Sequence, residues 1–137
     1  MAVTTAQLKI TSAADSLTSS AIAIDETTTL YDAGTTDGMT KTTGLARKSF
    51  AASTVTLLLD DAAYADNKAS KLYIKNTDAA GASASTVAVS LGTIGGESKI
   101  GILHNNEWAW IPWSGASDIN VECSSATTLV EWMLIFE

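Results

Sequence analysis

The chain has 137 residues, of which 46% are hydrophobic and 17% charged, and its net charge is −7. A length of this order fits one domain, and so high an apolar content excludes a disordered chain. The acidic balance argues against a nucleic-acid partner, the lack of an apolar run of about 20 residues against a membrane span, and the single Cys123 against a disulfide scaffold. We therefore expect one domain over residues 1–137.

Short segments in which apolar and polar residues alternate recur along the chain, and this period of two predicts strands. In chain order, the predicted strands are Gln7–Ser12, Ala21–Asp25, Thr27–Asp32, Ser53–Leu59, Lys71–Asn76, Ser85–Leu91, Ser98–Leu103, Glu107–Trp113, Ser117–Cys123 and Thr127–Phe136. So many short strands with frequent turns predict an all-β fold, either an antiparallel, jelly-roll-like β-sandwich or a flattened barrel.

Three connections between the predicted strands stand out. Residues 33–49 contain three glycines and few large apolar side chains, which predicts one long loop that is functional or mobile. Residues 60–70 are expected to hold a single helical turn, because alanines favour helix. Residues 77–84 are polar and small, which is typical of the tip of a hairpin whose arms would be Lys71–Asn76 and Ser85–Leu91.

The long predicted loop ends in a cluster of positive charges. Lys41, Arg47 and Lys48 are the only cations between residues 10 and 67. A cationic loop on an acidic protein can dock on an acidic partner. The alternative is an ordinary solvated surface.

The last strand, within TLVEWMLIFE, is apolar on both faces. Trp132, Leu134 and Phe136 alternate on one side, and Met133 and Ile135 lie on the other. A strand of this kind must be covered on both faces. One sheet of a sandwich supplies one cover, so a loop of the same chain or a neighbouring subunit must supply the second.

Tryptophans gather in the segment EWAWIPWSG. Alternation places Trp108 and Trp110 on one face, Pro112 marks a sheet edge or a strand end, and Trp113 follows it. Such a cluster predicts a core or a subunit interface, since aromatic residues are enriched at interfaces. Stacking on sugar rings is the alternative.

No residue pattern indicates catalysis. His104 is the only histidine and is expected in an exposed turn, whereas Cys123 alternates with apolar residues and is expected to be buried. Asp60, Asp61 and Asp66 could surround a cation, but their spacing does not fit a calcium loop and favours solvated carboxylates. We expect no enzyme, no cofactor and no metal site.

The second half of the chain resembles a known group of proteins. It contains LYIKNTD (Leu72–Asp78), IGILHNNEWAWIPWSGASDINVECS (Ile100–Ser124) and TTLVEWMLIFE (Thr127–Glu137). This succession is similar to that of small virion structural proteins of tailed bacteriophages, especially marine and cyanobacterial ones. The resemblance implies a β-sandwich that is part of the particle.

Within that group, the decoration (cement) proteins of the capsid suit this chain. As a decoration protein, the chain is expected to form a homotrimer and to bind the major capsid protein on the outer capsid surface, after synthesis in the host cytoplasm, without nucleic-acid or membrane partners. A tail or fibre module that binds host carbohydrate is the alternative. The residues expected at interfaces are Lys41, Arg47, Lys48, Trp108, Trp110, Trp113, Trp132, Leu134 and Phe136.

Overall fold

The computed structural model describes residues 3–79 and 84–137. Its contacts divide the chain into two compact units, Met1–Thr40 and Lys41–Glu137. The single domain expected over residues 1–137 stays a prediction.

The first unit is built on an antiparallel hairpin. Strand β1 (Thr5–Ser12) pairs with β2 (Ile22–Thr29) along its whole length. The two strands predicted over residues 21–32 are one strand, so that prediction is wrong. Asp25 and Glu26 do not interrupt β2, because they lie opposite Lys9 and Leu8 of β1 and keep the ladder intact.

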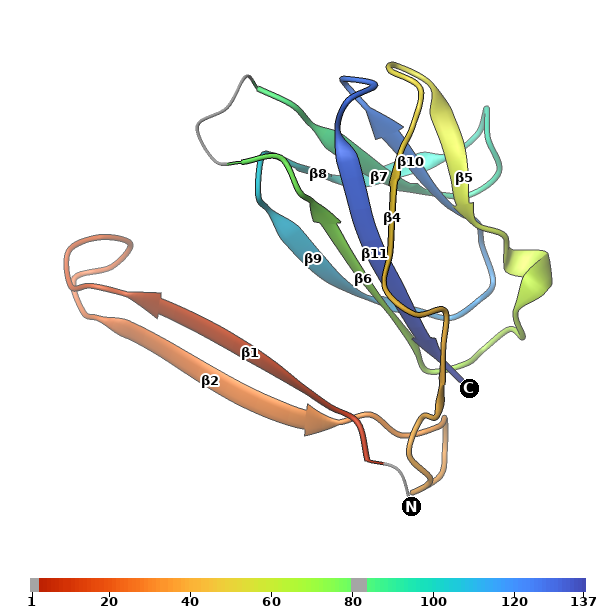
Figure 1. Ribbon diagram of the computed structural model, residues 1–137. Coiled ribbons are helices and arrows are strands. Elements are labelled where there is room, and N and C mark those ends of the chain that lie inside the picture. Colours follow the sequence, from red (N-terminus) through yellow and green to blue (C-terminus); the bar gives the residue numbers. More distant parts are fainter. Residues whose placement is uncertain (1–2, 80–83) are drawn as a thin grey trace. The chain divides into compact units, whose positions relative to one another are not determined.

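The second unit is a sandwich of two antiparallel sheets (Figure 1). One sheet has the order β5-β10-β7-β8, and the other has the order β3-β11-β6-β9, with β4 also paired to β11. The strands are β3 (Lys41–Thr42), β4 (Ala46–Ser49), β5 (Val55–Leu59), β6 (Ser70–Asn76), β7 (Val87–Leu91), β8 (Ser98–Leu103), β9 (Trp108–Trp113), β10 (Ile119–Cys123) and β11 (Leu129–Phe136).

The order of β4 to β11 is that of a jelly roll. When the strands are numbered from β4 as the first to β11 as the eighth, the sheet β4-β11-β6-β9 has the order 1-8-3-6. The sheet β5-β10-β7-β8 has the order 2-7-4-5. The chain therefore crosses between the sheets at every connection except the β7–β8 hairpin. The predicted all-β sandwich is confirmed, and across the described residues the sheets do not close into a flattened barrel.

The long loop predicted over residues 33–49 is wrong at its end, where residues 41–42 and 46–49 form two short strands. β3 pairs with the end of β11, and β4 pairs with its beginning. The break between them lies at Thr43 and Gly44, where Gly44 has a φ of +72°. Thr43 still exchanges hydrogen bonds of 3.0 Å with Leu134. Hydrophobic alternation does not predict these strands, because an edge strand pairs through its backbone and tolerates polar and charged side chains.

The predicted hairpin around residues 77–84 is also wrong. β6 pairs with β11 and β9, whereas β7 pairs with β10 and β8, so the two expected arms belong to different sheets. Residues 80–83 of its predicted tip lie outside the described residues. The helical turn expected after β5 is confirmed as a short 3-10 helix, η1 (Asp61–Ala63). Within the described ranges, no helix has the length and apolarity needed to cross a membrane.

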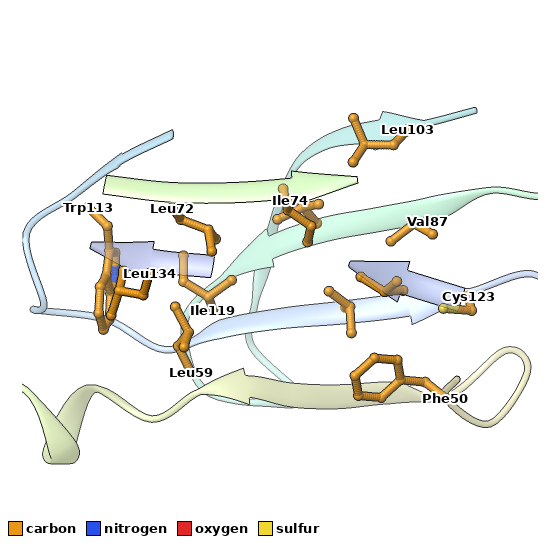
Figure 2. Packing of buried hydrophobic residues seen from close by; sticks show 13 residues of the cluster. Phe50, Leu59, Leu72, Ile74, Val87, Leu103, Trp113, Ile119, Cys123 and Leu134 are labelled. Carbon is orange, nitrogen blue, oxygen red and sulfur yellow. The ribbon is translucent and has the colours of Figure 1, made fainter. Parts of the chain in front are cut away.

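The core lies between the sheets (Figure 2). Alternation along β6 turns Leu72 and Ile74 inward, and neither retains any exposed surface. Leu134 of β11 meets them from the neighbouring strand, and Ile119 of β10 faces them from the other sheet. Burial of such side chains contributes about 1.5–3 kcal/mol each and is the main source of stability.

The outer strands of the sandwich are irregular. β5 has a register shift against β10, and β8 has one against β7. β9 carries Pro112, which has no backbone N–H to offer to a further strand. The fourth edge is the one broken at Gly44.

Candidate interaction surface

The outer face of the β3-β11-β6-β9 sheet gathers aromatic and basic side chains. The backbone register places Arg47, Glu131, Lys75 and Trp108 side by side across β4, β11, β6 and β9. The next row holds Met133, Tyr73 and Trp110. We call this region the aromatic–basic surface and define it by Arg47, Lys71, Tyr73, Lys75, Trp108, Trp110, Glu131 and Met133.

Trp108 is the most prominent residue of this surface. Its side chain is 51% exposed, although large aromatic side chains gain most from burial. Trp110 is half-buried on the same face, and the alternate residues Ala109 and Ile111 pack on the core. The predicted division of this strand into two faces is therefore confirmed.

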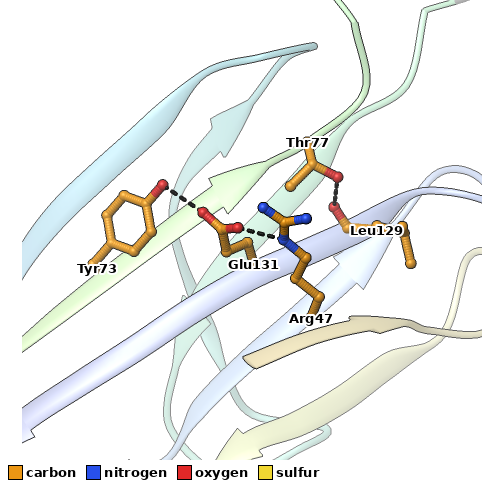
Figure 3. Close-up of polar contacts among 5 residues, drawn as sticks. All are labelled: Arg47, Tyr73, Thr77, Leu129 and Glu131. Atoms are coloured by element: carbon orange, nitrogen blue, oxygen red, sulfur yellow. Dashed lines mark hydrogen bonds and ion pairs between the residues drawn. The ribbon is translucent and has the colours of Figure 1, made fainter. Parts of the chain in front are cut away.

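Glu131 lies at the centre of the surface and is held by two donors (Figure 3). Its carboxylate accepts hydrogen bonds from Nε of Arg47 and, at 2.9 Å, from the hydroxyl of Tyr73. Only 7% of Glu131 is exposed, so this charge is paired within a largely covered position. The arrangement fixes the Tyr73 ring and the Arg47 side chain against the sheet.

The two acids of this network titrate away from their ordinary values. The hydrogen bond from Arg47 is the main cause that lowers the pKa of Glu131, and it outweighs the opposing effect of burial. Burial, followed by the hydrogen bond to Glu131, raises the pKa of Tyr73 to about 12. Both shifts favour an ionised Glu131 and a neutral Tyr73 at neutral pH.

A second polar contact holds the end of the surface. The Thr77 hydroxyl donates a hydrogen bond of 2.8 Å to the carbonyl oxygen of Leu129 (Figure 3). The backbone N–H of Thr77 reaches the same oxygen at 3.1 Å. β6 and β11 are thus joined beyond their last regular pair.

Several residues expected at interfaces lie instead inside the sandwich. Leu134 is fully buried, and Trp113 is 4% exposed, with its indole N–H donating to the carbonyl oxygen of Ser117. Trp132 and Phe136 are partly buried and pack on the same core. Leu134, Trp132 and Phe136 lie on the inner face of β11, and Trp113 ends β9, so all four contribute to the core between the sheets.

The residues on the outer face of β11 differ in exposure. Glu131 and Ile135 are 7% and 9% exposed, beside the edge strands β3 and β4. Leu129, on the same face, is 45% exposed, and a cover by a neighbouring subunit stays a prediction.

The predicted cations do not form one patch. Arg47 belongs to the aromatic–basic surface, whereas Lys48 lies 5.5 Å from the centre of the Phe50 ring and Lys41 is exposed on β3. Tyr73, Lys75 and Glu131 were not expected at a site. Alternation already turns Lys71, Tyr73 and Lys75 outward, but only the strand pairing reveals that they adjoin Trp108.

Three carboxylates meet at the end of β5. Asp60 and Asp61 are joined by Asp118, not by Asp66, and one oxygen of each lies within 4.8 Å of the others. Asp118 accepts a 3.0 Å hydrogen bond from the Asp61 backbone N–H, and Asp60 accepts one of 3.0 Å from that of Ala62. These are the residues that could hold a cation, and their present contacts cap the η1 turn.

The remaining reactive groups are separate from one another. Cys123 is fully buried, and burial is the first cause that raises its pKa, so the thiol is poorly nucleophilic. His104 is exposed in the connection between β8 and β9. A pocket of about 210 Å³ near the end of β11 is lined by residues that include Tyr64, Lys68 and Glu137. Lys68 and Glu137 form an ion pair of 2.9 Å.

Comparison with known proteins adds no assignment: no family model, no curated protein and no solved structure matches the chain.

Proposed function

We propose that this protein is a structural component of a tailed-bacteriophage virion, a capsid decoration (cement) protein that binds the outer shell and stabilises contacts between capsomers. In this role it forms a homotrimer and binds the major capsid protein, and it needs neither catalysis nor a cofactor. The resemblance of residues 72–137 to virion proteins motivates the proposal.

The observation that carries the proposal is the aromatic–basic surface on a jelly-roll sheet. The surface combines an exposed Trp108 with Tyr73 and with Arg47 at the other end of the same row, and Trp, Tyr and Arg supply most of the energy of protein–protein binding. The strand order of β4–β11 recurs in viral capsid and lectin domains, which supports the proposal by analogy.

Capsid attachment is tested with particles that lack the protein. Purified shells of a phage mutant deleted for this chain are mixed with the full-length protein and sedimented, and the pellets are imaged by electron cryomicroscopy. We expect density on the outer shell at a fixed stoichiometry. Density on the tail, or none on the particle, would overturn the proposal.

The cations of the edge strands give a sharper form of this test. Lys41→Glu combined with Lys48→Glu is expected to weaken shell binding about tenfold or more, if these charges meet an acidic capsid surface. Lys99→Glu, on the other sheet and 54% exposed, is the matched control. Point variants are preferable to deleting residues 33–49, because that deletion removes β3 and β4.

Carbohydrate binding by a tail or fibre module is the second candidate. The exposure of Trp108, next to the polar groups of Tyr73, Lys75 and Glu131, favours it. Trp113 does not extend the row, since it is buried. A glycan array separates the candidates: binding that Trp108→Ala abolishes in a folded protein supports the lectin function, whereas no glycan binding by the wild type removes it.

A further inference from the structure

The hairpin β1–β2 presents an apolar face that the first unit itself leaves uncovered. Its register places Ile10 opposite Ile24, with Leu8 and Ile22 as diagonal neighbours on the same side. Leu8, Ile10 and Ile24 are 43%, 43% and 40% exposed. A two-stranded hairpin is at best marginally stable in water by itself. This face therefore requires a partner surface.

The charge of the first unit narrows the choice of partner. Residues 1–40 contain one lysine and five carboxylates, a net charge of −4. Glu26 lies opposite Leu8, on the apolar side of the hairpin. A partner for this face must combine apolar area with positive charge.

The aromatic–basic surface meets both requirements. The surface carries three cations, Arg47, Lys71 and Lys75, against one carboxylate, Glu131. Trp108, Trp110 and Met133 supply the apolar area between them. Each copy of the chain therefore carries one acidic apolar face and one basic aromatic face.

We propose that the β1–β2 hairpin of one copy binds the aromatic–basic surface of a second copy. The inference deepens the self-association part of the proposed function and rests on it, but it does not depend on binding to a capsid. The contact is heterologous, because two different faces meet. A contact of this kind propagates from copy to copy and closes into a ring when the rotation allows it.

Two variants of the full-length chain each remove one face. Ile24→Asp places a charge in the apolar side of the hairpin and leaves the sheet intact, whereas Trp108→Asp places a charge on the sheet and leaves the hairpin intact. Sedimentation velocity is expected to show that the wild type associates and that each variant is monomeric, with association weakened at least about 30-fold. Addition of salt is expected to weaken the wild-type assembly.

Mixing the two variants is the decisive measurement. The intact hairpin of the Trp108→Asp chain can still bind the intact sheet of the Ile24→Asp chain, so equimolar mixing is expected to produce a one-to-one heterodimer. A contact between two hairpins, or between two sheets, predicts no such rescue. Absence of the heterodimer, or a Trp108→Asp chain that associates like the wild type, would overturn the proposal.

Matched controls keep the outcome interpretable. Thr11→Asp adds the same charge on the polar side of the hairpin, and Ile102→Asp adds it to an exposed residue of the other sheet. Both are expected to associate as the wild type does. Leu8→Ala provides a milder second variant if circular dichroism shows that Ile24→Asp perturbs folding. A wild type that stays monomeric at millimolar concentration overturns this contact, whereas failure to bind shells counts against the decoration role alone.

Discussion

The hydroxyl of Tyr73 donates a 2.9 Å hydrogen bond to Oε1 of Glu131 on the neighbouring strand. The two residues are diagonal neighbours, because Glu131 lies opposite Lys75 and Tyr73 lies opposite Met133. With Arg47 on the other carboxylate oxygen, a charge with little solvent contact is kept on the outer side of the sheet.

Neutralising Glu131 is expected to destabilise the sandwich in a pH-dependent way. At pH 7, Glu131→Gln should lower the free energy of unfolding by about 1–2 kcal/mol, because it removes a charge-assisted hydrogen bond. The pKa of Glu131 is lowered from 4.5 in the fold, so its contribution is present above that pH and is lost as the pH falls through the folded pKa.

Urea unfolding between pH 3 and pH 8 measures this difference. The difference in the free energy of unfolding between the wild type and Glu131→Gln should become smaller below about pH 4.5. Glu122→Gln is the control, since its 3.5 Å pair with Lys99 is more exposed and should matter little. A difference that stays constant across the acid range would contradict the assignment.

Tyr73 is expected to be the last tyrosine to ionise. Its pKa is raised to about 12, mainly by burial, so its phenolate absorbance should appear about two pH units after that of a free tyrosine. The raised pKa stabilises the fold below pH 10, and this contribution is lost as the pH rises toward 12.

Ultraviolet titration of the native protein tests this order. Tyr73→Phe should remove the latest step and leave the contributions of Tyr31 and Tyr64. Persistence of the late step in that variant would mean that another tyrosine is responsible.

Replacing Leu134 is expected to affect folding and not association. The side chain is fully buried in the core, so Leu134→Ala should lower the free energy of unfolding by about 2–5 kcal/mol. Ile102→Ala, at a 49% exposed position, should cost much less. Denaturant unfolding gives both values, and sedimentation of the folded variant should match the wild type. A near-neutral Leu134→Ala that dissociates the assembly would instead restore Leu134 as an interface residue.

Gly115 is expected to tolerate no side chain. Its φ is +83°, and a Cβ atom there would lie 2.4 Å from the carbonyl oxygen of Ala65. Gly115→Ala should therefore cost about 2–4 kcal/mol, from backbone strain and displacement of the facing segment. Gly44→Ala has a similar φ of +72° but open space, and should cost only about 1 kcal/mol. Thermal or urea unfolding measures the loss of stability in each variant. Equal losses would mean that the contact with Ala65 adds nothing to the cost of Gly115→Ala.

Strand positions and faces were predictable because alternation is local. The inward direction of Leu72 and Ile74 and the burial of Cys123 follow from a period of two along each strand. Pairing was not predictable: β6 and β7 follow each other in sequence, yet they belong to different sheets. For the same reason the alternation of Tyr73 was visible, but its hydrogen bond with Glu131, 58 residues away, was not.

The edge strands were also not predictable from the sequence. Ala46–Ser49 has only one small apolar residue, and its membership in the sheet comes from backbone hydrogen bonds to β11. The sequence did not distinguish whether Leu134 and Trp113 belong to the core or to an interface. Apolar residues in such strands are compatible with both positions.

The irregular outer strands have a consequence for how copies of the sandwich can assemble. The bulges of β5 and β8, Pro112 in β9 and the interruption at Gly44 all disfavour addition of a foreign strand. Growth of the sandwiches into an endless cross-β fibre is thereby discouraged even at high protein concentration. Packing through sheet faces remains open, and it allows assemblies of limited size.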